Sequence, residues 1–269
     1  MRSAGVFAAA FAIRTKAGLQ YRVPAVAGIA TQFFWGLMLI MVYSAFYAGS
    51  KNYPASLPQA VSYVWLQQAF LYAFGLWIYD QEIAETIRTG QIAYELTRPR
   101  SLYVFWLAKT LGQRISGVML RFPPVVVIAS VLPSAYRLSP PAGLAALGFF
   151  IIALFLGMLV TAAYTLIAYL TLFYFQTSTV IMQSFSLFAQ FLAGQFVPIL
   201  FFPERAQRVL YALPFAYVND FAIRIYTGEY GAAFIARGLF IQAAWILVLG
   251  AAGLLMLKSA LKRTVAHGG

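Results

Sequence analysis

Three glutamines recur at a spacing of seven residues in a long uncharged stretch of the chain. Gln176, Gln183 and Gln190 would lie along one stripe of a helix, because seven residues make about two turns. Amide groups are disfavoured next to lipid, so the stripe is expected to face protein or a water-filled cavity. In the first case the amides hold helices together, and in the second they contact a solute. The spacing leaves both alternatives open.

A second polar and aromatic face is expected between residues 59 and 79. Gln68 and Tyr72 are four residues apart there, with other aromatic residues at helical spacing. Aromatic stripes serve packing or membrane-interface contacts more often than they bind ligands. Even so, Gln68 and Tyr72 are included with Gln183 and Gln190 as candidates for a translocation path.

Arg121 is a further candidate for this path. It follows Arg114 by seven residues, so it lies roughly 10 Å deeper along a helix. Three alternatives stay open for its side chain. It extends back toward the headgroups, it faces a cavity, or it pairs with a carboxylate such as Glu85 or Glu95.

The residue counts exclude most enzyme chemistry. The chain has no cysteine, a single histidine and seven acidic residues, and it contains no phosphate-binding loop of the type GxxxxGK[ST]. The histidine is His267, close to the end of the chain, where it cannot build a metal cluster or a Ser-His-Asp triad. We therefore predict no catalytic residue, no metal and no cofactor bound by this chain.

The composition predicts an all-α polytopic membrane protein. Of 269 residues, 62% are hydrophobic and 10% are charged, whereas soluble domains carry about 25% charged residues. Although the net charge is +12, the basic residues flank apolar runs, which favours membrane topology over nucleic-acid binding. The apolar runs predict six transmembrane helices in one domain over residues 1–269. The expected spans are 24–47, 59–79, 115–132, 144–175, 180–201 and 232–257.

The flanking segments set the expected topology. Residues 1–23 predict an interfacial helix, because basic residues follow a short apolar stretch. Six spans place both termini on one side, and most Lys and Arg residues fall on that side, which indicates the cytoplasm. Pro123-Pro124 is expected to kink the third span. Gly148 and Gly157 are expected to allow close helix contact in the fourth.

Residues 80–114 form the long polar loop of the chain. Asp80 and the acidic residues after it predict the start of a helix, and Gly90 predicts its end. A short amphipathic piece follows, and Ser101 is expected to cap a further helix. Exposed Ile, Tyr and Leu side chains on such a loop need a partner to bury them. The alternatives are a docking element for a cytoplasmic protein and a solvated loop resting on the headgroups.

Two stretches carry a family resemblance. Residues 87–99 (IRTGQIAYELTRP) resemble the cytoplasmic loop signature of ABC-2 permeases, the membrane subunits of bacterial ATP-binding-cassette exporters. Residues 194–203 (GQFVPILFFP) and 213–217 (LPFAY) resemble that family's pattern after the fifth span.

The resemblance implies that transport and ATP binding are carried out by separate subunits. The loop after the second span would form a coupling helix that docks on a separate ATPase, which would bind ATP and Mg. The expected docking residues are Glu85, Ile87, Arg88, Gly90, Ile92, Tyr94, Glu95, Leu96, Arg98 and Pro99. Residues 202–231 would re-enter the outer leaflet, with an outer gate at Pro198, Pro203 and Pro214.

These expectations describe the permease subunit of an exporter in a bacterial cytoplasmic (inner) membrane. Its expected partners are two ATPase subunits, a second permease, like or unlike, and the lipid bilayer. The cargo would be an amphiphilic small molecule, lipid or peptide that crosses by alternating access. The alternative is a stand-alone secondary transporter or channel. It is disfavoured because ion coupling needs ionisable residues deep inside the spans, and Arg121 is the candidate there, with Arg237 counted on the outer side.

Overall fold

The computed structural model describes residues 2–49, 55–175 and 178–262, and every regular element among them is a helix. Gln176 and His267 lie outside these residues. The helices, with η for 3-10 helices, are α1 (Arg2–Leu19), α2 (Arg22–Gly49), α3 (Leu57–Ala69), α4 (Leu71–Phe74), α5 (Gln81–Arg88), α6 (Ile92–Leu96), α7 (Leu102–Val131), α8 (Leu144–Thr171), α9 (Ser178–Leu192), η1 (Ile199–Phe201), α10 (Glu204–Leu210), η2 (Phe215–Tyr217), α11 (Asp220–Tyr226) and α12 (Ala232–Leu261).

Four helices among the described residues are long and apolar enough to cross a membrane. They are α2, α7, α8 and α12, which have 28 to 30 residues each. Helix α7 begins at Leu102, as the predicted Ser101 cap requires, and continues without a break through Lys109 and Arg114 into the expected third span, residues 115–132. The helix also continues through Pro123 and Pro124, so these prolines do not end it.

The predicted span 59–79 is not one continuous helix. Helix α3 ends at Ala69, the single turn of α4 ends at Phe74, and the chain from Gly75 to Asp80 is not helical. Arg114 explains how this break is tolerated in the interior. Its guanidinium donates to the carbonyls of Ala73 and Gly75 at 3.0 and 3.1 Å and, at 3.4 Å, to that of Ile78. The cation thereby satisfies carbonyls that the unwound backbone leaves without helical partners.

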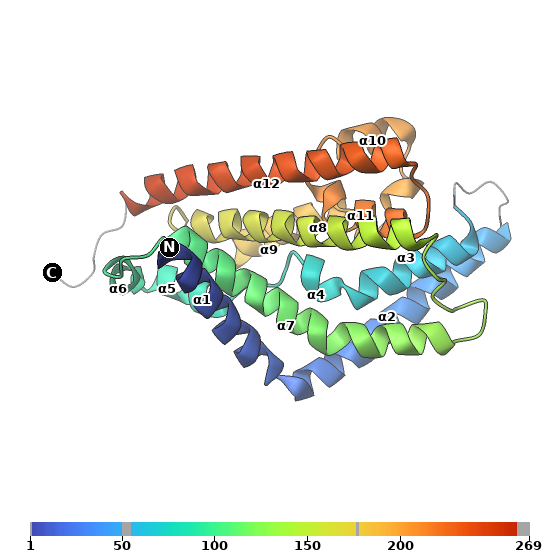
Figure 1. The fold of residues 1–269 in the computed structure, drawn as a ribbon, viewed down its shortest axis with the longest axis horizontal. Coiled ribbons are helices and arrows are strands. Elements are labelled where there is room, and N and C mark those ends of the chain that lie inside the picture. The colour runs from blue at the N-terminus through green and yellow to red at the C-terminus, as the bar shows by residue number, and fades with distance from the viewer. Residues whose placement is uncertain (1, 50–54, 176–177, 263–269) are drawn as a thin grey trace.

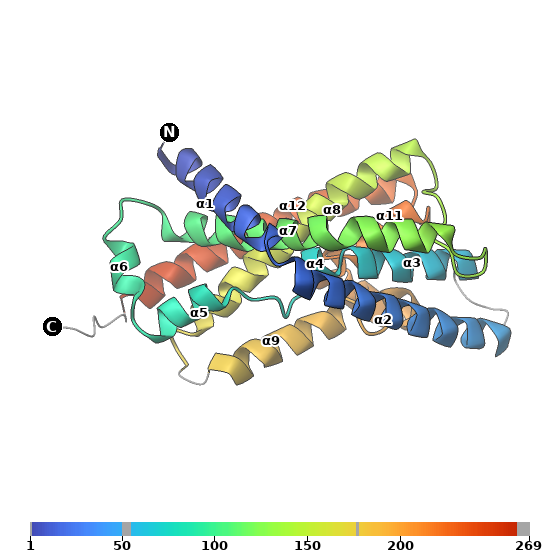
Figure 2. The same cartoon turned by 90° about the horizontal axis from the view of Figure 1, so that it is seen from below.

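The helices run side by side in one elongated bundle (Figure 1). Helix α12 packs along α8, and α1 crosses α7 before the chain turns sharply into α2. The first residues of α1 and the last residues of α12 lie at the end of the bundle that also carries α5 and α6, as both views show (Figures 1 and 2). The short helices from η1 to α11 gather near the opposite end.

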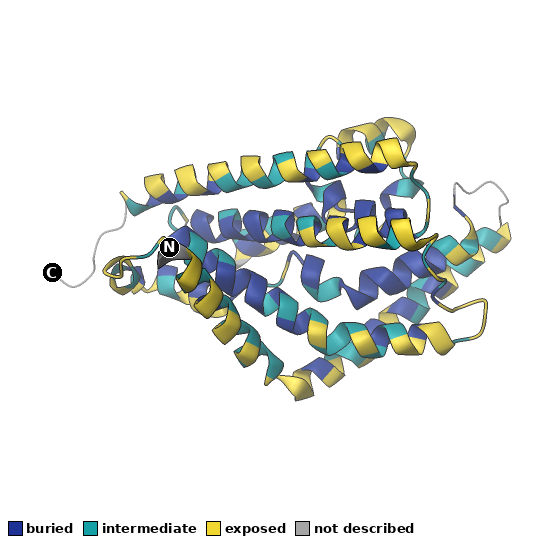
Figure 3. Ribbon diagram, viewed as in Figure 1, coloured by how far each residue is buried: buried dark blue, intermediate teal, exposed yellow. Residues whose placement is uncertain are grey.

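Burial follows the arrangement expected for a protein in lipid. Helices α3, α4 and α11 are buried, whereas α12 exposes most of its outer face (Figure 3). That face carries Phe240, Leu247 and Leu255, which are at least 70% exposed. Large apolar side chains in such numbers are unfavourable in water and favourable against acyl chains.

Close packing in α8 depends on one of its two predicted glycines. A Cβ at Gly157 would lie 2.3 Å from the carbonyl oxygen of Val218, so the backbone after η2 can approach only a glycine. The prediction for Gly148 is wrong, because a Cβ there would meet nothing within 4 Å.

Candidate functional site

The loop between α4 and α7 carries two short helices whose ends follow the sequence signals. The carboxylate of Asp80 caps α5 by accepting a hydrogen bond from the Glu82 amide at 3.0 Å. Gly90 has φ of +73°, a left-handed conformation that ends the helix and is favourable only for glycine among ordinary residues. Helix α6 then brings residues 92–96 back toward the bundle.

Asp80 is also the centre of an ion-pair cluster that joins three helices. It is fully buried, and its Oδ2 lies 2.9 Å from Arg14 Nη2 on α1 and 4.0 Å from Lys109 Nζ on α7. Lys109 Nζ lies 2.9 Å from Glu82 on α5. The Asp80 amide donates to the hydroxyl of Tyr169 on α8. The start of α5 is therefore tied to α1, α7 and α8 at one point.

The apolar face of α5 and α6 turns inward. Ile83, Ile87 and Ile92 pack with Trp106 of α7 and Leu257 of α12 in one cluster. The expectation that an isoleucine of this loop is exposed is wrong for Ile92, which is 1% exposed, and Ile87 is buried too. Both are bulky apolar side chains on the amphipathic face, so they fill the chain's own core.

Glu95 anchors the loop as well. Its Oε2 accepts a hydrogen bond from Trp106 Nε1 at 3.0 Å, and its Oε1 lies 3.7 Å from Arg100. The guanidinium of Arg100 stacks on the ring of Phe105, 3.4 Å from its centroid. These contacts hold α6 against the start of α7.

The opposite side of the loop faces outward. Tyr94 is 76% exposed and Leu96 is 44% exposed, although both are large apolar residues. Charged residues surround them, and Glu85 and Arg88 form an exposed pair at 3.1 Å. We call this surface the loop platform, and its exposed residues are Glu85, Arg88, Tyr94, Leu96, Arg98 and Pro99.

Tyr72 and Arg121, two of the residues predicted to line a path, come together. The guanidinium carbon of Arg121 lies 4.2 Å from the centre of the Tyr72 ring. Arg121 therefore does not pair with Glu85 or Glu95, whose ion-pair partners are Arg88 and Arg100. Gln68 is buried in the same region, and its main-chain carbonyl accepts a hydrogen bond from Gln32 Nε2 at 3.0 Å.

Gln183 and Gln190 lie on α9, outside this group. Gln183 is exposed, and Gln190 donates to Ser186 Oγ at 2.7 Å, within its own helix. An open apolar groove of about 1010 Å³ runs beside α9. Its lining residues are Tyr164, Ser184, Phe185, Leu187, Phe188, Phe191, Phe196 and Phe215. Aromatic residues dominate this face of α9, and Gln183 lies beside it.

The three prolines of the predicted outer gate share one structural role. Pro198, Pro203 and Pro214 each directly precede a short helix, namely η1, α10 and η2. Proline suits this place because its fixed φ starts a helix while its missing amide ends the preceding segment. The segment after α9 is thus divided into short pieces.

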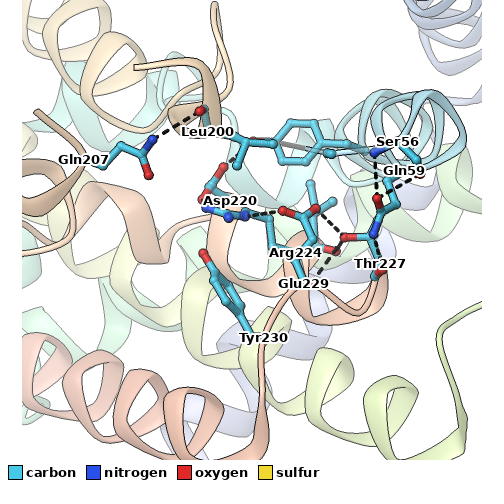
Figure 4. Close-up of polar contacts among 12 residues, drawn as sticks. Ser56, Gln59, Leu200, Gln207, Asp220, Arg224, Thr227, Glu229 and Tyr230 are labelled. Carbon is cyan, nitrogen blue, oxygen red and sulfur yellow. Dashed lines mark hydrogen bonds and ion pairs between the residues drawn. The ribbon is translucent and has the colours of Figure 1, made fainter. Parts of the chain in front are cut away.

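A buried polar network holds this outer segment together (Figure 4). Asp220 is fully buried and accepts hydrogen bonds from Tyr63 on α3, at 2.9 Å, and from Tyr211. Arg224 donates to the Tyr211 hydroxyl and to Glu229 Oε2, at 2.7 Å in each case. Glu229 in turn accepts from Thr227, whose carbonyl accepts from Gln59 of α3.

Comparison with known proteins decides the family. The family model for an ABC-2 family transporter protein matches residues 37–268, which is most of the chain. The chain belongs to the ABC-2 transporter family. It is therefore a membrane permease of the ABC transporter class, as the loop and outer-segment motifs predicted. A search of curated proteins finds no match.

The sequence did not reveal the polar centres of this ABC-2 permease. Arg14, Lys109 and Arg114 were counted as basic residues flanking spans, but each has a specific partner in the structure. Asp220 and Arg224 lie in the segment expected to re-enter the outer leaflet, and both are buried there. The i,i+4 spacing of Asp220 and Arg224 was the available signal for the outer pair.

Glu82 shows the electrostatic effect of the inner cluster. Its pKa lies below the ordinary value, chiefly because Lys109 donates a hydrogen bond to its carboxylate, with further attraction from Lys109 and Arg14. Glu82 therefore stays ionised, and its pairing with Lys109 persists in mildly acidic solution.

Proposed function

We propose that this ABC-2 chain is the membrane subunit of an ATP-driven exporter, and that the loop platform is the surface on which a separate ABC ATPase docks. The observation that carries the proposal is the exposure of Tyr94 and Leu96 on a loop whose helical isoleucines, Ile83, Ile87 and Ile92, are buried. An exposed aromatic residue beside an aliphatic one, surrounded by charges, is typical of a protein-binding surface. We infer that the platform is held in position by loop residues on its bundle side, namely Ile87, Gly90, Ile92 and Glu95.

The cluster around Asp80 supports a mechanical role for the docked loop. A partner that pulls on α5 also pulls on α1 through Arg14, on α7 through Lys109 and on α8 through Tyr169. In the proposed cycle, ATP and Mg bound by two ATPase subunits bring two such loops together. The attached helices then tilt and switch the exposure of a cavity.

The proposed topology has six spans, with α3–α4 and α9 as the two shorter ones. Both termini lie on the cytoplasmic side of a bacterial inner membrane, together with α5 and α6. The segment from η1 to α11 is the proposed outer gate. The apolar groove beside α9 faces a second permease or the cargo, which suits an amphiphilic small molecule, lipid or peptide. Gln68, Tyr72, Arg121, Gln183 and Gln190 are proposed to border the path.

Pull-down from detergent-solubilised membranes of the source cells tests the docking surface. The double variant Tyr94→Asp, Leu96→Asp is expected to lose ABC ATPase subunits from the purified complex, because two charges would be placed in an apolar contact. Both side chains are exposed, so the variant should insert and elute as the wild type does. Val209→Asp is the matched control, since Val209 is an exposed apolar residue near the opposite end, on α10.

Full retention of the ATPase by the double variant would refute the docking surface. Uphill solute transport by the purified chain alone, without nucleotide, would instead support a secondary transporter. The variant Tyr94→Cys adds a test of topology, because the wild-type chain contains no cysteine. It should react with a membrane-impermeant reagent only from the cytoplasmic side.

A further inference from the structure

A small cavity lies at the bend between α1 and α2, where both helices meet α7. Its volume is about 280 Å³, and its lining includes Arg14, Tyr21, Gln113, Ser116 and Arg121. The lining contains two guanidinium groups and no carboxylate. The cavity therefore presents hydrogen-bond donors and positive charge to whatever enters it.

Arg121 is the unusual member of this lining. Within the described part of the chain it takes part in none of the ion pairs, whereas Arg14 pairs with Asp80 at 2.9 Å. Arg121 is half-buried in an apolar helix, where an uncompensated cation is costly. The Tyr72 ring offsets only part of that cost, because a cation–π contact leaves the guanidinium hydrogens free to donate.

The surroundings make room for this guanidinium. At Gly28 of α2 a Cβ would lie 2.8 Å from Arg121 Nε, so any side chain there would displace the arginine. The Tyr72 ring is seated in the notch at Gly117 of α7, where a Cβ would lie 1.8 Å from the ring. Two glycines on two helices thus shape the place of the Arg121–Tyr72 pair.

Exposed apolar residues next to lining residues along the chain indicate how an occupant is oriented. Val23 precedes Pro24 of the lining and Met119 precedes Leu120, and they are 81% and 54% exposed. An amphiphile could place its acyl chains against such residues and its charged group in the cavity. A cavity of this volume holds one headgroup anion but not a whole lipid.

We propose that this cavity binds the phosphate of an anionic phospholipid, with Arg121 as its principal ligand and Tyr21 and the second Nε2 hydrogen of Gln113 as further donors. Ser116 lines the cavity, and its hydroxyl donates to the Gln113 main-chain carbonyl at 2.9 Å. Guanidinium groups bind phosphate through paired, charge-assisted hydrogen bonds. The bound lipid would neutralise Arg121 and would fix the bend between α1 and α2 against α7. This site is independent of ATPase docking, because it lies on the bundle and uses none of the platform residues.

Native mass spectrometry of the purified, delipidated protein tests the proposal without nucleotide or ATPase. The wild type is offered phosphatidylglycerol and phosphatidylcholine with the same acyl chains. We expect it to retain phosphatidylglycerol about tenfold better, because both lipids offer a phosphate but the choline cation of phosphatidylcholine would be repelled by Arg14 and Arg121 in a lining without a carboxylate. Arg121→Gln is expected to abolish this preference, and Arg121→Lys to keep part of it. Arg237→Gln, at an exposed arginine near the start of α12, should leave it unchanged.

Three results would overturn the proposal. The first is a wild type without preference for phosphatidylglycerol, and the second is an equal preference in Arg121→Gln. The third is thermal stabilisation by inorganic phosphate without lipid retention, which would indicate a soluble anion as the ligand. If Arg121→Gln does not fold, a photoreactive phosphatidylglycerol on the wild type decides. Labelling must fall on peptides containing residues 14–24 or 113–121, and labelling elsewhere would refute the site.

Discussion

The two ends of the bundle each contain a fully buried aspartate near an arginine, but the partners come from different places. At the end that carries α5 and α6, which we propose as the inner end, Asp80 is held by Arg14 from α1 and Lys109 from α7, far from it along the chain. At the end proposed as the outer one, Asp220 and Arg224 lie on the same short helix, and Tyr211 and Glu229 flank it closely. Tyr63 of α3 is the distant contributor there.

This difference indicates two structural roles: the inner cluster joins several helices, and the outer network stabilises one segment. The inner cluster joins α5 to α1 and α7 by ion pairs in addition to the packing between these helices, so a displacement of α5 is transmitted to α1 and α7. The outer network mostly joins residues 211–230 to one another, and Tyr63 and Gln59 of α3 attach this segment to the bundle. A compact gate segment and a loop that pulls several helices are complementary parts of the proposed transport cycle.

The largest effect is expected from Asp80→Asn. In this variant the carboxylate that remains near Arg14 is Glu82, 3.8 Å away. Lys109 also loses the negative charge of Asp80, 4.0 Å away. Breaking a buried ion pair on one side costs about 3 to 5 kcal/mol. The free energy of unfolding in detergent, followed by circular dichroism, should fall by about that amount. A loss below about 1 kcal/mol would show that the inner cluster is not a structural joint.

Asp220→Asn should cost less, about 2 kcal/mol, because Arg224 keeps Glu229 at 2.7 Å and no cation is left alone. Hydrogen exchange should rise within residues 204–230 and stay unchanged in α5 and α6. The double variant Asp80→Asn, Asp220→Asn should be additive within about 0.5 kcal/mol, as for separate sites. A larger coupling would contradict the separation of the two ends.

Acid should weaken the inner end before the outer one. The pKa of Glu82 in the folded protein lies below its ordinary value, so its ion pair stabilises the fold above that ordinary value. The contribution is lost as the pH falls through the lowered pKa. Unfolding midpoints measured from about pH 6 to about pH 2 should fall less steeply for Glu82→Gln than for the wild type. Glu204→Gln, an exposed control on α10, should follow the wild type.

The smallest effect is expected for Arg208→Gln on the outer surface. Arg208 and Glu204 are 3.9 Å apart and more than 80% exposed, so solvent screens the pair. The unfolding midpoint should not change measurably. A clear loss of stability would mean that the outer segment depends on its surface charges as well as on the Asp220 network.

Much of the docking loop could be predicted because its signals are local. The cap at Asp80, the left-handed Gly90 and the start of α7 after Ser101 depend on residues within a turn of one another. Ile92 and Tyr94 could not be separated in this way, since both are large, apolar and close together. Only the position of Trp106 and Leu257 in the packed bundle decides that Ile92 is covered and Tyr94 is exposed.

By itself, the sequence determined that the protein is helical and lies in a membrane. Apolar runs, the scarcity of charge and the loop motifs suffice for this, because the bilayer forces backbone groups into helices. Tertiary structure alone decided the polar pairs. Arg114 meets the broken end of α4, and Arg121 meets Tyr72 beside the bend of α1 and α2. A long side chain in a low-dielectric interior takes its partner from whichever helix lies within reach, and that depends on packing that no short stretch of sequence encodes.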